Sequence, residues 1–254
     1  MNVSKESVRL LVSAPSQYAS RLARTTGEIQ AAQALRFQVF NLELNEGLNR
    51  SYDTGLDADP FDAVCDHLIV EHVASQQVVG TYRMQTGLRA AKNLGYYCAQ
   101  EFGFQVFEPW RDRIVELGRA CVHRQHRNLL VLGLLWKGIA DYASERGGRY
   151  LIGCSSLTSQ DPAAGASAYS ELCRNHLAEP QWRTNPLPSH EIPLEAVTEE
   201  PVAIPKLLRA YLTIGGKICG PPALDTQFKT IDFLTLLDIE ALPKATRERF
   251  FGES

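Results

Sequence analysis

Two charged side chains interrupt an apolar segment near the middle of the chain. Glu116 and Arg119 lie within residues 115–122, where every other residue is apolar or glycine. A charge inside a buried strand costs free energy unless it is paired or takes part in chemistry. The segment therefore nominates Glu116 and Arg119 as catalytic residues. The alternative is a structural ion pair between Arg119 and a carboxylate elsewhere.

A second group of candidates is acidic. Residues 45–66 are polar and contain Asp59, Asp62 and Asp66, which a loop could present to a ligand. Upstream, Arg36 lies on a predicted amphipathic helix. The simpler interpretation is that the acidic loop and the arginine are solvated surface charges.

A third group follows the charged segment. Arg124 and Arg127 precede Asn128, which is a suitable N-cap for the next predicted helix. Unpaired backbone N–H groups and the positive end of a helix dipole suit a phosphate. We consider this turn a candidate phosphate site, although basic turns at helix starts also occur without a ligand.

Other chemistries lack their sequence signals. The chain has no Walker loop, no GxGxxG motif and no Ser/His/Asp order. Its six cysteines are never closer than 19 positions, so we predict free buried thiols and no metal site.

Charge and hydropathy limit the class of protein. With 26 basic and 29 acidic residues the net charge is −3, which argues against a nucleic-acid binder. The longest apolar run, residues 129–136, is too short to span a bilayer, and the N-terminal residues lack a signal-peptide pattern. We therefore expect a cytoplasmic protein.

The elements that position the candidates follow from hydrophobic periodicity. Residues 26–44 are predicted to form an amphipathic helix that begins with a capping box, Thr25 and Glu28. Residues 67–73 and 78–85 are rich in β-formers and predict an antiparallel hairpin.

The strongest pattern covers residues 114–155. It predicts a strand over 114–122, a helix from Asn128 to the glycines at 147–148, and a strand over 150–155. A strand, helix, strand unit of this kind crosses over to a parallel neighbour.

Strand parity constrains the two charged residues. In a regular strand Glu116 and Arg119 would point to opposite faces, because the side-chain period is two. A β-bulge at Gly118 would bring both side chains to one face, and bulges are common beside active sites.

The remaining segments complete one domain. Residues 1–17 have no sustained period and are expected to form an N-terminal arm, and residues 18–254 a single domain. We expect a helix over 163–176, an irregular proline-rich insertion near 178–203, and then a helix and two strands.

Taken in order, these motifs resemble the GCN5-related N-acyltransferase superfamily. Within it, they resemble the haemolysin-like ornithine N-acyltransferases of bacteria, which use acyl carrier protein and are related to acyl-homoserine-lactone synthases. The matching segments include 32–40 (AQALRFQVF), 59–70 (DPFDAVCDHLIV), 80–83 (GTYR), 116–123 (ELGRACVH), 133–136 (GLLW), 207–216 (LLRAYLTIGG), 217–223 (KICGPPA) and 225–233 (DTQFKTIDF).

The resemblance implies an α/β fold with a mixed, mostly antiparallel sheet, splayed between two central strands and flanked by helices. The donor's phosphopantetheine arm would lie in the splay, held by Val122, His123, Arg124, Arg127, Asn128 and Leu129. Where the superfamily has small residues for a diphosphate, this chain has bulky leucines after Asn128. We therefore expect acyl carrier protein as donor rather than acyl-CoA, and no permanently bound cofactor.

The resemblance also implies site roles. Glu116 would act as general base, and backbone N–H groups of residues 118–122 would stabilise the oxyanion. The remaining candidates are substrate-binding side chains that either contact the amino acid or brace one another: Arg36, Asp59, Asp62, Asp66 and Arg119. Basic residues between 124 and 149 would meet the acidic carrier protein.

The implied function is transfer of a long 3-hydroxyacyl chain to the α-amine of ornithine, which gives lyso-ornithine lipid. Peripheral contact with the inner face of the membrane is compatible with such a product. The alternatives are another acceptor amino acid, a lactone synthase that uses S-adenosylmethionine, and a non-catalytic lipid-binding, haemolysin-like protein.

Overall fold

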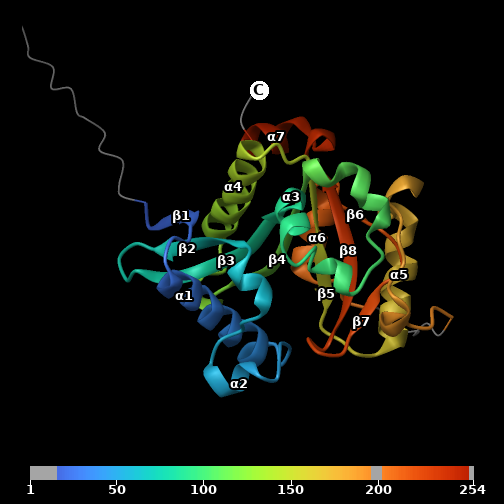
Figure 1. Ribbon diagram of the computed structural model, residues 1–254, viewed down its shortest axis with the longest axis horizontal. Helices are drawn as coiled ribbons and strands as arrows, with labels where there is room; N and C mark the ends of the chain where they lie inside the picture. Colours follow the sequence, from blue (N-terminus) through green and yellow to red (C-terminus); the bar gives the residue numbers. More distant parts are fainter. Residues whose placement is uncertain (1–15, 196–201, 252–254) are drawn as a thin grey trace, which may run out of the picture.

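The computed structural model describes residues 16–195 and 202–251, and an eight-stranded mixed sheet crosses it (Figure 1). The path of the sheet is β1-β2-β3-β4-β5-β8-β6, with β7 also paired to β8. Every pair is antiparallel except β4 with β5, which confirms the expected mixed, mostly antiparallel sheet. The strands are β1 (Tyr18–Leu22), β2 (Asp66–His72), β3 (Gln77–Thr86), β4 (Ile114–Val122), β5 (Tyr150–Leu157), β6 (Lys217–Ile218), β7 (Ala223–Asp225) and β8 (Thr230–Asp238).

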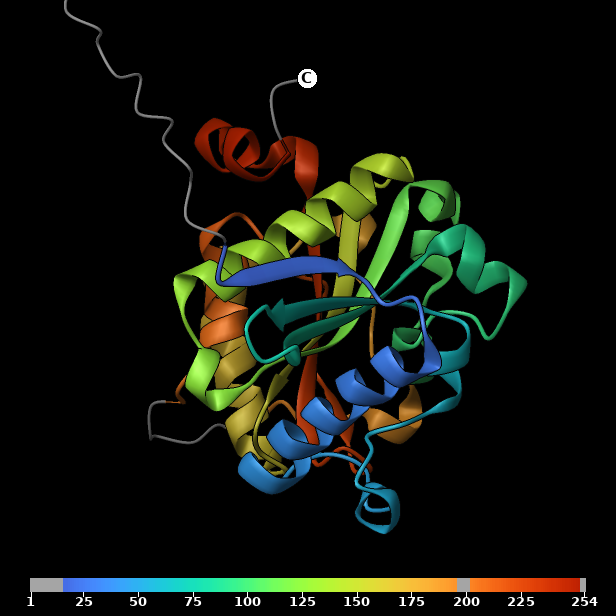
Figure 2. The same cartoon turned by 90° about the vertical axis from the view of Figure 1, so that its left-hand side faces the viewer.

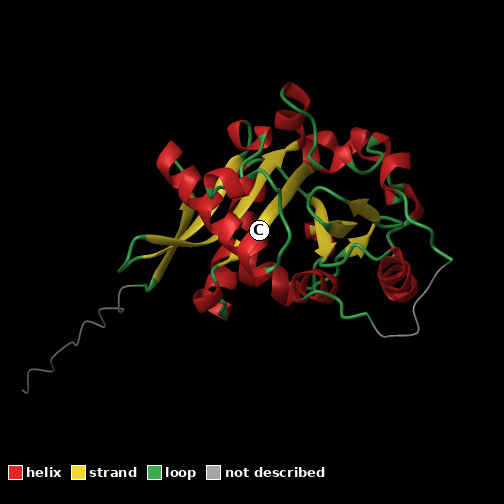
Figure 3. Ribbon diagram, turned by 90° about the horizontal axis from the view of Figure 1, so that it is seen from below, coloured by secondary structure: helices red, strands yellow, loops and turns green. Residues whose placement is uncertain are grey.

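Helices cover both faces of the sheet. α1 packs on β3 and β4, and α4 packs on β1, β2 and β3 from the opposite side (Figure 2). Seen from below, the helices surround the strands (Figure 3). The α-helices are α1 (Thr26–Phe37), α2 (Ser51–Thr54), α3 (Gly87–Lys92), α4 (Leu129–Glu145), α5 (Pro162–His176), α6 (Lys206–Thr213) and α7 (Lys244–Phe251).

The two parallel central strands separate part-way along their length. β4 and β5 are in register only at Ile114, Val115 and Glu116, and β5 then continues beside β8 as far as Leu157. In the described part of the chain, residues 117–122 therefore have a strand partner only on the β3 side. Gly153 lies at the point of separation, where an added Cβ would come within 2.3 Å of the Leu117 carbonyl oxygen.

The long helix predicted over residues 26–44 changes its winding. The capping box at Thr25 and Glu28 is present, but the α-helix ends at Phe37 and continues as a π-helix, Gln38–Glu43. The Leu44 amide donates to the carbonyl of Val39, five residues back. Apolar periodicity does not reveal this change, because residues on both sides of it remain buried.

Most of the predicted secondary structure is confirmed with small shifts of its ends. The hairpin of β2 and β3, the crossover through α4 to a parallel β5, and the helix at 163–176 are all present. The Asn128 side chain caps α4 by accepting from Leu130 and Val131. Residues 96–102 contain a 3₁₀ turn, Cys98–Gln100, and the sequence did not predict β1, α2, α3, β7 or α7.

The irregular part of the chain includes several 3₁₀ turns. Within the proline-rich stretch, residues 196–201 lie outside the described residues, as does most of the expected N-terminal arm. The remaining turns are Pro60–Ala63, Gln105–Arg113, Arg124–His126, Pro180–Trp182, Pro188–His190 and Ile239–Ala241. Among the helices described, none is long and apolar enough to cross a membrane.

Candidate active site

A cavity of about 320 Å³ lies where β4 and β5 separate. Its walls come from segments far apart in the sequence, including Glu116–Ala120 of β4 and Cys154–Ser156 of β5. A smaller cavity of about 40 Å³ shares Leu117–Ala120 as a wall and is lined by Tyr82 and Tyr211, whose hydroxyls are 3.0 Å apart. The separation of the strands therefore opens a space next to unpaired backbone of β4.

Glu116 is held by a set of hydrogen bonds at this cavity. Its side chain is buried, and it accepts from Gln85 Nε2 at 2.7 Å, from the Tyr97 amide at 3.0 Å and from the Cys98 amide at 2.9 Å. Gln85 and the Tyr97 amide bond Oε2, the Cys98 amide bonds Oε1, and the Cys98 thiol is a further donor to this carboxylate. Since Glu116 also lines the cavity, it can take a proton from a molecule bound there.

Arg119 reaches the same cavity by way of a β-bulge. Gly118 pairs with Arg83 and Cys121 with Thr81, so two residues of β4, Arg119 and Ala120, stand where β3 offers one. Arg119 has φ = 51°, a left-handed conformation that is strained for a non-glycine residue. The expected bulge is therefore present, one residue beyond Gly118, and it brings Glu116 and Arg119 to one cavity.

The side chain of Arg119 is enclosed by aromatic rings. Its guanidinium carbon lies 4.8 Å from the centroid of the Tyr97 ring and 4.3 Å from that of Phe228. Burial would lower the pKa of Arg119, but Tyr97, Asp57 and Asp59 outweigh it and raise the pKa well above its usual range. Arg119 is therefore a permanent cation in the wall of the cavity.

Six buried charges form a closed arginine–aspartate ring beside the cavity. Each arginine contacts two aspartates and each aspartate two arginines. The contacts are Asp57–Arg36 at 2.9 Å, Arg36–Asp62 at 2.8 Å, Asp62–Arg83 at 3.2 Å, Arg83–Asp59 at 2.6 Å, Asp59–Arg119 at 3.2 Å and Arg119–Asp57 at 3.3 Å. No side chain of the ring is more than 8% exposed, so these contacts are little screened by water.

The arginines of the ring keep its aspartates ionised and neutralise most of their charge. Burial would raise the pKa of Asp62, but the hydrogen bonds and charge of Arg36 and the charge of Arg83 hold it below its usual value. Burial opposes the shift at Asp59 as well, and the charges of Arg83 and Arg119 lower its pKa. The ring thus brings Arg36, Asp59, Asp62 and Arg119 together as mutual partners, the bracing role that the sequence left open.

Asp66 lies apart from the other acidic candidates. It accepts from the Tyr142 hydroxyl at 2.8 Å and pairs with Arg89 at 2.7 Å. It is not among the residues that line either cavity at the strand separation.

The residues expected to bind the donor lie together at the end of β4 and the start of α4. Arg127 donates to the Val122 carbonyl at 3.1 Å and to Glu43 at 2.8 Å, and Gln38 contacts the His123 ring at 3.2 Å. Arg124 is exposed, and the Leu129 side chain is 80% exposed.

The expected carrier-protein surface is less basic than its sequence indicates. Arg127, Lys137, Arg146 and Arg149 each form an ion pair with a nearby carboxylate. Lys137–Asp141 is an i,i+4 pair that helix spacing reveals, whereas the partners of Arg127 and Arg149 are distant in the sequence.

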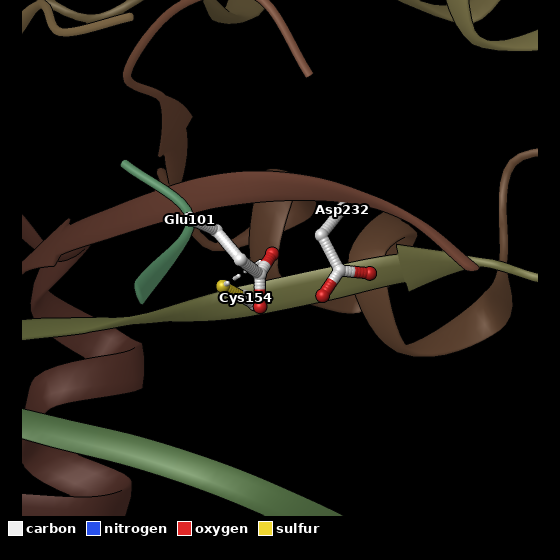
Figure 4. Close-up of side chains that lie close together, drawn as sticks. All are labelled: Glu101, Cys154 and Asp232. Carbon is white, nitrogen blue, oxygen red and sulfur yellow. Dashed lines mark hydrogen bonds between the residues drawn. The ribbon is translucent and has the colours of Figure 1, made fainter. Parts of the chain in front are cut away.

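A group of buried carboxyls in the same region was missed by sequence reasoning. Glu46 and Asp232 line the larger cavity, and Glu101 lies against Asp232 and Cys154 (Figure 4). Burial raises the pKa of Asp232 to about 6 and that of Glu101 well above its ordinary value. Asp232 carries the same sequence signal as Glu116, a charge within an apolar strand.

Glu101, Cys154 and Asp232 are also the group of described residues closest to a metal-ligating arrangement, with potential ligand atoms within 4.8 Å of one another. A thiol must lose its proton to bind a metal. A hydrogen bond to Cys98 and burial raise the pKa of the Cys154 thiol well above its usual range. The group therefore fits a metal ion poorly.

Comparisons with known proteins agree with this geometry. A family model described as an acetyltransferase (GNAT) domain matches residues 35–137. The chain is 35% identical over 239 residues to an L-ornithine N(alpha)-acyltransferase of Brucella abortus, covering 87% of this chain and 84% of the relative. It is 33% identical over 249 residues to the enzyme of that name from Rhodobacter capsulatus, covering 94% and 96%.

Solved structures share the fold at low identity. An N-acyl amino acid synthase from uncultured soil microbes, FeeM, has a TM-score of 0.54 at 11% identity and covers 88% of this chain and 91% of its own. The acyl-homoserine-lactone synthase LasI has a TM-score of 0.51 at 13% identity, covering 93% and 96%.

The split sheet, the buried glutamate at its opening and the matching domain define a GNAT-fold acyltransferase. Within that class, the chain belongs to the L-ornithine N(alpha)-acyltransferase family. The resemblance seen in the sequence is thereby confirmed, and a non-catalytic lipid-binding protein is excluded.

Proposed function

We propose that this acyltransferase moves a long 3-hydroxyacyl chain from acyl carrier protein to the α-amine of ornithine and releases lyso-ornithine lipid. The observation that carries the proposal is the placement of Glu116, a buried carboxylate, on a cavity at the strand separation. The name shared by the relatives supports ornithine as the acceptor.

The reaction is aminolysis of a thioester. Glu116 takes a proton from the α-ammonium, the freed nitrogen attacks the thioester carbon, and an N–C bond forms as the C–S bond breaks. The nitrogen loses a second proton as the amide forms. Of these two protons, one goes from Glu116 to the departing thiolate, directly or through water, and the other is released to solvent. Backbone N–H groups of residues 117–122 on the unpaired side of β4 stabilise the oxyanion.

The donor arm enters as an extended chain. Its amides pair with the free edge of β4 as an added strand, which places the thioester near Glu116. Its phosphodiester lies near Arg127 at the start of α4. Because Asn128 already binds the amides of Leu130 and Val131, the helix start suits one phosphate better than a diphosphate, which supports acyl carrier protein over acyl-CoA.

The carrier protein docks around the mouth of this path. Arg124 supplies positive charge, and Leu129 and Leu130 are 80% and 65% exposed, so an acidic partner with an apolar patch fits this surface. The reaction takes place in the cytoplasm, with peripheral contact to the membrane that receives the product.

The acceptor's carboxylate binds on the cationic side of the cavity. Arg119 and Arg83 line it, whereas Arg36 is fully buried and acts as a positioning residue through Asp57 and Asp62. Arg119 is therefore the direct partner that we propose for this carboxylate.

The proposal is tested with purified protein, ornithine and 3-hydroxyacyl thioesters of either acyl carrier protein or coenzyme A, with products identified by mass spectrometry. We expect Nα-acylornithine from the carrier-protein donor, at a kcat/KM at least about 10-fold above that for the coenzyme A donor. No acylornithine from either donor would overturn the function. Equal use of both donors would overturn the choice of donor.

A further inference from the structure

We propose that Asp232, together with Glu101 and Glu46, binds the side-chain ammonium of the acceptor amino acid. This inference rests on the proposed function, since it concerns the second amine of the same substrate. It assigns a ligand of defined chemistry, a primary ammonium, to carboxyls that the reaction mechanism above does not use.

The first observation is an unsatisfied acceptor. Asp232 is only 5% exposed and lines the cavity. The side chains of Ser156, Thr230 and Glu101 bond its carboxyl group, but among the described residues its Oδ1 atom has no hydrogen-bond partner. A buried carboxylate oxygen without a donor costs free energy unless a ligand supplies one. The position of this oxygen points to a donor group that arrives with the substrate.

The second observation is the crowding of acidic groups at this place. Carboxylate oxygens of Glu101 and Asp232 lie within 4.8 Å of each other (Figure 4), and both side chains are almost fully buried. Asp225 adds a further negative charge near both. Each ring aspartate contacts two arginines, whereas among the described residues neither Glu101 nor Asp232 forms an ion pair, although the charge of Arg119 acts on both.

The chemistry of the group selects a primary ammonium. An –NH₃⁺ group carries one positive charge and three N–H donors, so it can bridge two or three carboxyls at once. It would keep Asp232 and Glu101 ionised together and satisfy Oδ1. Glu46, which also lines the cavity and is 5% exposed, supplies a third acceptor.

Asp232 and Glu116 line the same cavity, so one substrate molecule can contact both. Glu116 binds the Cys98 amide, the Cys98 sulfur lies 3.4 Å from that of Cys154, and the Cys154 sulfur lies 4.0 Å from Glu101. One short chain of contacts therefore joins the base to the acidic group. A diamino acid with its terminal amine at Asp232 would present its α-amine to Glu116.

The test is a comparison of two acceptors with one carrier-protein donor: ornithine and 2-aminopentanoic acid, which lacks only the terminal amine. For the wild-type enzyme we expect kcat/KM for ornithine to be at least about 100-fold higher. In Asp232→Asn and Glu101→Gln, that ratio should fall by about 10-fold or more, with most of the change in KM for ornithine. Activity on 2-aminopentanoic acid should stay within about 2-fold.

Controls separate the possible failures. Asp112→Asn, at an exposed aspartate, should leave the ratio unchanged, and thermal unfolding shows whether each variant is folded. If the wild type acylates neither acid, the proposed function fails. If it acylates ornithine but both variants keep the wild-type ratio, the subsite is wrong. Calorimetry with Zn²⁺ alone provides one more check. If Zn²⁺ binds, competes with ornithine and no longer binds to Asp232→Asn, the group is a metal site and the ammonium proposal is wrong.

Discussion

Arg119 Nε lies 3.3 Å from Asp57 Oδ2, and this contact closes the arginine–aspartate ring between α1 and β4. Asp57 is fully buried, and it joins Arg119 to Arg36, residues 83 positions apart in the chain. The ring therefore ties the acidic loop to the strand that carries Glu116. Through Arg119, it also supports the strained backbone of the bulge.

Removing Asp57 should destabilise the protein severely. Asp57→Asn leaves Arg36 and Arg119 each with one carboxylate fewer in a buried setting, at a cost of about 3 kcal/mol in the free energy of unfolding. Urea denaturation measures this change. Asp53→Asn, at an exposed position on α2, is the matched control and should shift stability by less than about 0.5 kcal/mol. Equal effects of the two substitutions would contradict an energetic role for the ring.

Glu116→Gln should reduce turnover by about 100-fold or more, because the amide cannot take a proton from the attacking amine. Single-turnover measurements with a preformed acyl carrier protein thioester would show the loss in the chemical step. Glu108→Gln, at a surface glutamate that pairs with Arg111, should keep full activity. Unchanged turnover in Glu116→Gln would remove this residue from the role of base.

Two glycine substitutions should separate stability from catalysis. In Gly153→Ala the new Cβ meets the Leu117 carbonyl oxygen at 2.3 Å, so β4 and β5 must shift where they separate. We expect the free energy of unfolding to fall by about 2 kcal/mol. In Gly118→Ala the Cβ meets nothing within 4 Å, so stability should hold while the methyl group narrows the cavity and raises KM for the donor. Thermal melts and steady-state kinetics on both variants provide the comparison.

Acid should destabilise the protein through the ring. The pKa of Asp59 and that of Asp62 are lowered in the folded state, so the stabilisation they provide is present above the unfolded value near pH 4 and is lost as pH falls below it. Unfolding free energies measured from pH 7 to pH 3 should decline below about pH 4. Asp62→Asn should be less stable at pH 7 and show a shallower decline.

Asp232 should give a dependence of the opposite sign. Its pKa is raised to about 6 in the folded protein, by burial and by the charge of Asp225, although Arg119 partly opposes the shift. Folding then takes up a proton, so this group lowers stability as pH rises from about 4 to above 6. Asp232→Asn should remove that slope in the substrate-free protein. An unchanged slope would show that Asp232 does not titrate in this range.

The strand that carries Glu116 could be predicted from local pattern, and the bonds around it could not. Two charges in an apolar run were enough to nominate Glu116 and Arg119, and strand parity indicated that a bulge would bring both to one face. The ring depends on contacts such as Arg119 with Asp59, 60 positions apart in the chain, which periodicity does not encode. The sequence thus left three roles open for Arg36: a solvated surface charge, a contact with the amino acid, or a brace for the aspartates.

The acidic group shows a second limit of the sequence. Asp232 stands in an apolar strand as Glu116 does, but its meaning depends on Glu101, which follows a 3₁₀ turn with no distinctive pattern. Burial raises the pKa of both carboxyls, and only the assembled fold determines which side chains are buried at a cavity wall. For the same reason the sequence left several roles open for the carboxylates of residues 45–66, and the structure shows that arginines neutralise much of their charge.

The free edge of β4 also bears on self-association. An exposed strand edge on the rim of a sheet can pair with another molecule and begin aggregation. Here the unpaired edge of residues 117–122 faces the gap between β4 and β5. A slender extended arm can enter this gap, and a second folded chain cannot. The enzyme thus keeps a surface for main-chain pairing while shielding it from its own copies.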